Sequence, residues 1–203
     1  MFEIKISLVL ILLLISIFLL GCTEDIAPKN PEKISFSYSS GAMHMEWGSF
    51  EISVDSAGNG YKINKMGLYM EVKKEFSFTQ EEINEVYDVA VKNNFYSLND
   101  SYEDPFIMDG GWERLSITVD GSTKTVQSSN YNLPQVDAVS LKIYSLVDSK
   151  LGTNAISNVF RDACPEKKIE CSGITEDKCA LLDSSGLEFE ECYACVEWSH
   201  YCE

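Results

Sequence analysis

Residues 115–127 read LSITVDGSTKTVQ, with apolar and polar side chains alternating on both sides of Asp120-Gly121. Alternation of this kind is typical of a half-buried strand. An Asp-Gly pair between two such runs is typical of a tight antiparallel turn, so we predict a β-hairpin here. Similar alternation occurs earlier in the chain, at residues 34–38, 50–54 and 68–72. Strands that follow one another without an intervening helix favour an antiparallel sheet.

Two helices are predicted in the same region. Thr79 can cap the first helix, and Glu82 completes a capping box with it. The helix then buries a stripe of apolar residues, namely Ile83, Val86, Tyr87 and Ala90. A second helix begins at Pro134, which suits a first turn, and ends before Gly152. We therefore predict an α+β domain over residues 33–152, an antiparallel sheet with two helices on one face.

This region also resembles a known type of domain. The resemblance rests on the turn at residues 55–60, the helix that starts at Thr79, the sequence Phe95-Tyr96-Ser97-Leu98 that follows it, and the hairpin over residues 112–127. With these features the chain resembles a small extracytoplasmic domain of unknown function that recurs in prokaryotic lipoproteins. In the order of its elements it is also similar to emfourin-type inhibitors of metalloproteases. The resemblance implies a fold and assigns no functional residue.

The amino terminus predicts export and a lipid anchor. Residues 6–20 are apolar apart from two serines, and this run is shorter than the roughly 20 residues of a membrane-spanning helix. It fits the apolar region of a signal peptide, predicted over residues 1–21. Leu19-Leu20-Gly21-Cys22 resembles the lipobox of prokaryotic lipoproteins, which implies cleavage after Gly21 and lipidation of Cys22 with acyl chains such as palmitate. An ordinary signal peptide and an uncleaved anchor are the alternatives. Residues 22–32 are predicted to be a polar tether.

The carboxyl terminus is rich in cysteine. Six cysteines follow residue 160, namely Cys164, Cys171, Cys179, Cys192, Cys195 and Cys202. An even number in an exported chain favours three disulfides. Zinc and a redox-active Cys-x-x-Cys remain as alternatives. We predict a small, disulfide-rich and partly helical module over residues 153–203.

A helix predicted from Glu188 to Tyr201 constrains the pairing. It places Cys192, Cys195 and Cys202 on one stripe. Neighbours on a helical stripe have Cβ atoms about 5–6 Å apart, whereas a relaxed disulfide needs about 3.8 Å. Each of the three should therefore pair with a cysteine before the helix, which leaves six of the fifteen connectivities.

Composition and motifs narrow the function. The chain has 32 acidic and 16 basic residues, a net charge of −16, which argues against nucleic-acid binding. It has two histidines and no Gly-x-Ser-x-Gly motif, and no residues are singled out as catalytic. Met43-His44-Met45 carries ligand types suited to Cu(I), although packed methionines are the simpler interpretation.

The segment 102–112, YEDPFIMDGGW, is predicted to be a partner-facing loop that presents Phe106 and Trp112. In the alternative interpretation, it is a plain connection whose two aromatic side chains close the core. We expect a non-enzymatic lipoprotein of the cell envelope, without a cofactor, held on the extracytoplasmic side of a membrane by lipid on Cys22 and binding a protein or peptide. A protease inhibitor, a metal carrier and an unrecognised enzyme are the alternatives.

Overall fold

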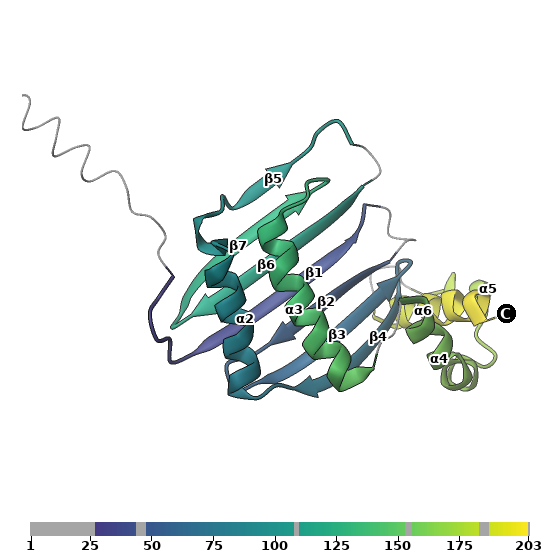
Figure 1. Ribbon diagram of the computed structural model, residues 1–203. Helices are drawn as coiled ribbons and strands as arrows, with labels where there is room; N and C mark the ends of the chain where they lie inside the picture. The colour runs from purple at the N-terminus through teal and green to yellow at the C-terminus, as the bar shows by residue number, and fades with distance from the viewer. Residues whose placement is uncertain (1–26, 44–47, 108–109, 153–155, 183–186, 203) are drawn as a thin grey trace, which may run out of the picture.

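The computed structural model describes residues 27–43, 48–107, 110–152, 156–182 and 187–202, and the account below concerns these residues. Their strands form one sheet in the order β4-β3-β2-β1-β6-β7-β5 (Figure 1). The strands are β1 (Ile34–Ala42), β2 (Ser49–Val54), β3 (Asn59–Met66), β4 (Met70–Ser77), β5 (Ser101–Glu103), β6 (Gly111–Val119) and β7 (Ser122–Ser129). Neighbouring strands run antiparallel, except that β5 runs parallel to β7. The predicted α+β class is confirmed.

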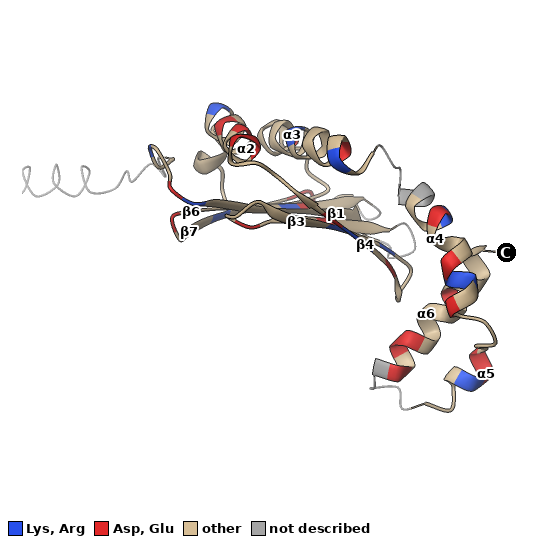
Figure 2. Cartoon of the chain, turned by 90° about the horizontal axis from the view of Figure 1, so that it is seen from below, with Lys and Arg blue, Asp and Glu red and all other residues tan. Residues whose placement is uncertain are grey.

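Helices α2 (Gln80–Lys92) and α3 (Pro134–Leu151) lie on the same side of the sheet (Figure 2). The capping box is present, because the Glu82 amide donates to Thr79 Oγ1 at 3.2 Å and the Thr79 amide donates to Glu82 Oε2 at 2.8 Å. Pro134 stands in the first turn of α3, and Gly152 ends this helix with a φ of 82°. Both helix starts were therefore predictable from local signals.

The hairpin of β6 and β7 is confirmed. Asp120 and Gly121 both have positive φ, 50° and 87°, as a type I′ turn requires. The inward side chains of β6 and β1 are buried against the two helices, among them Leu115, Ile117 and Phe36. The alternate positions on β1 are serines, so one face of the sheet forms the core and the opposite face is polar.

Two features of the sheet differ from the prediction or were not predicted. The structure begins β4 at Met70, and Leu68, predicted to lie in this strand, is 67% exposed in the turn after β3. The short strand β5 follows the 3₁₀ helix η2 (Phe95–Ser97), and it has no alternating pattern to reveal it. β5 depends on pairing with β7, a distant part of the chain, and the Gln127 amide of β7 also donates to the Asp100 carbonyl just before β5 at 2.9 Å.

Residues 27–33, which include part of the predicted tether, contact the domain. Ala27 packs against the main core, and the Tyr87 hydroxyl donates to the Pro28 carbonyl. The amides of Glu32 and Lys33 donate to Asp120 Oδ1 at 3.1 and 2.9 Å. The segment that enters the sheet is therefore fixed to it for several residues before β1 begins.

The carboxyl-terminal module consists of α4 (Ile156–Glu170), α5 (Glu176–Cys179) and α6 (Leu187–Cys202), and it lies beside the β4 edge of the sheet (Figure 1). Among the described residues, no helix has the length and apolarity that crossing a membrane requires. The predicted signal peptide, the lipobox and Cys22 lie outside the described residues.

Candidate functional site

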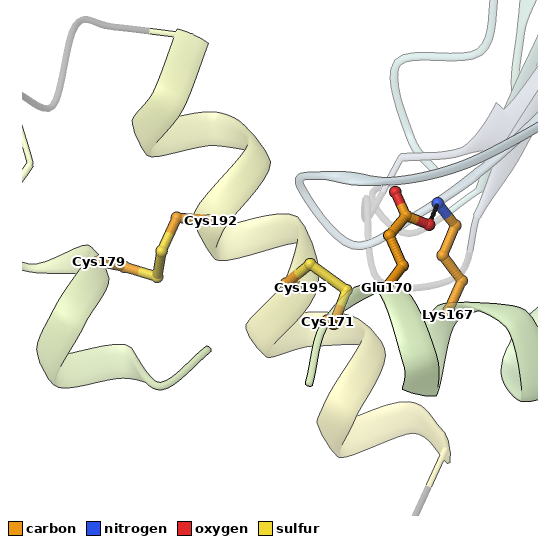
Figure 3. The surroundings of a disulfide bond; sticks show 6 residues. All are labelled: Lys167, Glu170, Cys171, Cys179, Cys192 and Cys195. Atoms are coloured by element: carbon orange, nitrogen blue, oxygen red, sulfur yellow. Dashed lines mark hydrogen bonds and ion pairs between the residues drawn. A yellow bond between two sulfur atoms is a disulfide. The ribbon is translucent and has the colours of Figure 1, made fainter. Parts of the chain in front are cut away.

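The six cysteines of the module form three nested disulfides. The pairs are Cys164–Cys202, Cys171–Cys195 and Cys179–Cys192, with Cα–Cα distances of 5.6, 5.1 and 5.5 Å. Figure 3 shows the middle and inner pairs, each joining α6 to a segment before it. The prediction that no two cysteines of the last helix pair with each other is confirmed. The sulfur atoms are thus occupied in bridges, in place of the zinc or redox alternatives.

The module also shares a small core with the sheet. Phe160 of α4 and Trp198 of α6 are buried, with ring centroids 5.4 Å apart. Met70 of β4 belongs to the same cluster and is 4% exposed. The cluster buries apolar surface from both parts of the chain, which stabilises the docking of the module on the edge strand.

A carboxylate holds the same junction. Glu197 of α6 accepts three backbone hydrogen bonds from the turn between β3 and β4: Oε1 from Leu68 at 3.1 Å, and Oε2 from Tyr69 at 2.8 Å and Met70 at 3.0 Å. Gly67 in this turn has a φ of 65°, and a Cβ added there would stand 3.0 Å from Glu197 Oε1. The backbone conformation of this turn therefore favours glycine, and a side chain there would also oblige the Glu197 carboxylate to shift slightly.

The predicted partner loop projects from the sheet. Phe106 is 91% exposed and Ile107 is 47% exposed. Residues 104–107 are nevertheless held in shape, because the Phe106 amide donates to Asp104 Oδ1 at 3.0 Å and Asn130 Nδ2 donates to the Ile107 carbonyl at 2.7 Å. Trp112 is partly buried in β6, paired with Gly41 of β1. Phe106 thus does not close the core, and of the two predicted aromatic residues it is the one presented to solvent.

The end of β1 lies next to this loop. The Met43 amide donates to the Gly110 carbonyl at 3.0 Å, and the Met43 side chain is 50% exposed. We call Met43, Phe106 and Ile107 the apolar tip. His44 and Met45, the other members of the predicted copper motif, lie outside the described residues. Within the described parts of the chain, no group of three or more His, Cys, Asp or Glu side chains is placed to hold a metal ion.

A partly buried polar cluster was not predicted from the sequence. Glu113 of β6 accepts hydrogen bonds from the Tyr38 hydroxyl at 3.1 Å and the Ser128 hydroxyl at 3.0 Å. Tyr38 also contacts Tyr144 of α3 edge to face, with ring centroids 5.6 Å apart. Burial raises the pKa of Glu113, and nearby Asp137 raises it further, while the two hydroxyl donors oppose the shift.

The Glu113 carboxyl group thus joins β6 to β1 and β7, and the ring contact of Tyr38 with Tyr144 connects this cluster to α3. A signal for it exists in the sequence, because Glu113 occupies the same alternation phase as Leu115 and Ile117, which are both buried. An acidic residue at an inward strand position predicts a hydrogen-bonded carboxyl group in the core.

Comparisons with known proteins assign the chain to no family. No protein-family model matches the chain, and no curated protein shows significant similarity to it.

Proposed function

We propose that the chain is a non-enzymatic lipoprotein, anchored by lipid on Cys22 to the extracytoplasmic side of a membrane, which binds a protein or peptide of the cell envelope through the apolar tip. The exposure of Phe106, which follows β5 in the chain, carries this proposal. Strand β5 ends on the side of the sheet away from residues 27–33 (Figure 1).

The direction of β1 supports this arrangement. β1 begins at Ile34, directly after the tether, and its last residue, Ala42, adjoins the apolar tip. The eight steps between the first and last residues of this nine-residue strand span about 26 Å at roughly 3.3 Å per residue. An anchor at Cys22 would therefore leave the tip on the side of the domain away from the membrane, where a partner can reach it.

The apolar tip can supply a substantial part of the free energy of binding to a partner. Full burial of an exposed phenylalanine side chain contributes about 1.5–3 kcal/mol. Because hydrogen bonds to Asp104 and Asn130 already hold the loop, less conformational entropy is lost on binding. Glu103 is exposed and Asp104 is partly buried beside the tip. A complementary partner would have an apolar pocket with a basic rim.

Site-specific crosslinking in the native envelope tests the tip. A photoreactive phenylalanine analogue at position 106 is expected to capture a defined partner, whereas the same analogue at Leu141, which is 66% exposed on α3, should not. Phe106→Ala should abolish co-purification of that partner without changing thermal stability, because the side chain makes few contacts. Equal capture from both positions, or co-purification unaffected by Phe106→Ala, would refute the role of the tip.

The anchor is tested separately. Cys22→Ser should remove metabolic labelling with palmitate and release the protein from the membrane fraction. The captured partner also tests the protease-inhibitor interpretation. If it is an extracellular metalloprotease that the protein inhibits at a one-to-one ratio, the apolar tip is the inhibitory loop.

A further inference from the structure

Three consecutive exposed residues connect the 3₁₀ helix η2 to strand β5. Leu98 before them is buried and Tyr102 after them is half-buried, whereas Asn99, Asp100 and Ser101 are all exposed. Their sequence is the acceptor motif for N-linked glycosylation, an asparagine followed by a residue other than proline and then by serine or threonine. No other asparagine of the chain is followed by serine or threonine at the second position. The single acceptor motif therefore lies at the surface.

Hydrogen bonds hold this segment in place without using the groups that the motif requires. The backbone amide of Asn99 donates to the Tyr102 hydroxyl at 2.9 Å. The carboxylate of Asp100 pairs with Lys124 of β7 at 2.8 Å. Among the described residues, none bonds to the carboxamide of Asn99 or to the hydroxyl of Ser101. Both groups of the motif are thus available from solvent.

The segment also lies where a modifying enzyme can reach it. β5 is the last strand in the order of the sheet, and it pairs with β7 over three residues, from Ser101 opposite Gln127 to Glu103 opposite Ser129. Figure 1 shows β5 along the outer edge of the sheet, on the side away from the disulfide module. A strand with so few pairs at an edge opens at a small cost in free energy, so its backbone can enter an enzyme site while the rest of the domain stays folded.

We propose that Asn99 is a site of N-linked glycosylation. The donor is an oligosaccharide attached to a lipid phosphate, and a membrane-bound transferase on the extracytoplasmic side joins it to the side chain. The amide nitrogen of Asn99 forms a bond to the anomeric carbon of the first sugar, and the bond from that carbon to the phosphate oxygen breaks. The lipid phosphate leaves with the bonding electrons, and one proton of the amide passes to a base of the transferase.

This proposal rests on the export in the proposed function, but on neither the lipid at Cys22 nor the apolar tip. Asn99 precedes one end of β5, and Phe106 of the apolar tip follows the other end. A glycan on Asn99 is therefore compatible with a partner at the tip. It would also cover the free edge of the sheet, and a bulky hydrophilic group there hinders pairing with the strands of other molecules.

Peptide mass spectrometry tests the site on the full chain purified from its own cell envelope. Cleavage after lysine and arginine yields the peptide 93–114, which contains Asn93, Asn94 and Asn99. In the wild type this peptide should carry the added mass of a glycan and release sugar fragment ions. Fragmentation along the backbone should place the added mass on Asn99.

Variants at position 101 separate the motif from mere exposure of an asparagine. Ser101→Ala should remove the glycan although Asn99 is still present, and Ser101→Thr should retain it, because threonine also completes the motif. Asn132, which is exposed but outside any such motif, supplies the control, and Asn132→Gln should leave the glycan unchanged. Disulfide mapping of each variant verifies that the chain has folded.

Three results would overturn the proposal: a wild-type peptide found only at its unmodified mass, a sugar placed on a residue other than Asn99, or a glycan that persists in Ser101→Ala. The peptide that carries Cys22 is analysed in the same preparations. A lipidated protein without a glycan contradicts glycosylation alone, and a glycosylated protein without lipid contradicts the anchor alone. The two proposals can therefore fail independently.

Discussion

Removal of the Glu197 carboxylate should loosen the turn between β3 and β4 without unfolding the disulfide module. In Glu197→Ala the amides of Leu68, Tyr69 and Met70 lose their shared acceptor. Hydrogen bonds to a charged group contribute about 1.5–3 kcal/mol each. The bond from Leu68 is exposed to water and the other two are partly buried, so we count only the latter and allow for partial replacement by water. The expected loss is then about 2 kcal/mol or more.

Amide hydrogen exchange on the full chain measures this loss directly. At about 1.4 kcal/mol per factor of ten, exchange at Tyr69 and Met70 should accelerate roughly 30-fold or more. Glu197→Gln retains one acceptor oxygen, so its acceleration should be intermediate. Glu190, which is exposed on the same helix, supplies the control, and Glu190→Ala should change these rates less than twofold.

Peptide mapping without reduction should still find all three disulfides in Glu197→Ala, which separates undocking from unfolding of the module. If exchange at Tyr69 and Met70 stays within twofold of the wild-type rate, the strand ladder alone holds this turn. The assignment of Glu197 as the polar tie between module and sheet would then be wrong.

Three further predictions concern the fold. Gly58→Ala should lower the free energy of unfolding in urea by about 3 kcal/mol or more, because a Cβ would stand 2.1 Å from a backbone carbonyl oxygen. Gly121 also has positive φ but open space around it, so Gly121→Ala should lower this free energy by only about 1 kcal/mol. Equal losses in the two variants would show that the predicted clash at Gly58 does not occur. The folded state raises the pKa of Glu113, so this group favours folding at low pH and loses that contribution as pH rises through its folded pKa. Glu113→Gln should therefore gain stability relative to wild type between pH 4 and 7, by no more than about 1 kcal/mol because the group is half-exposed. A difference in urea unfolding free energy between variant and wild type that stays constant over this pH range would refute this prediction. Replacement of both Cys179 and Cys192 by serine should lower the free energy of unfolding by about 3 kcal/mol, because the bridge closes a loop between cysteines 13 residues apart and so restricts the unfolded chain. An unchanged midpoint of thermal unfolding would exclude a stabilising role for this disulfide.

The elements that were predicted correctly have strong local signals. The hairpin at Asp120-Gly121 depends on two residues that tolerate positive φ, and α2 depends on the capping box of Thr79 and Glu82. The restriction on disulfide pairing followed from helical spacing alone. The choice among the six remaining connectivities did not, because it depends on how α4, α5 and α6 pack.

The candidate sites also divide into features that the sequence predicts and features that only the structure shows. A loop with exposed aromatic residues was predictable from its composition, but only the structure separates exposed Phe106 from partly buried Trp112. The acceptor motif at Asn99 is visible in the sequence, but its exposure at the edge of the sheet depends on the pairing of β5 with β7, which no local pattern predicts.

The sequence by itself therefore determined the class of fold, the approximate positions of α2, α3 and α6, and the partition of the last six cysteines into two groups of three, because periodicity, capping and turn chemistry act between near neighbours. It did not predict α4 or α5. Tertiary structure alone decided the strand order, the nested disulfides, the docking of the module through Met70 and Glu197, and the exposure of Asn99 at the edge of the sheet. These depend on contacts between residues up to 129 positions apart, and no local pattern encodes which distant surfaces are complementary.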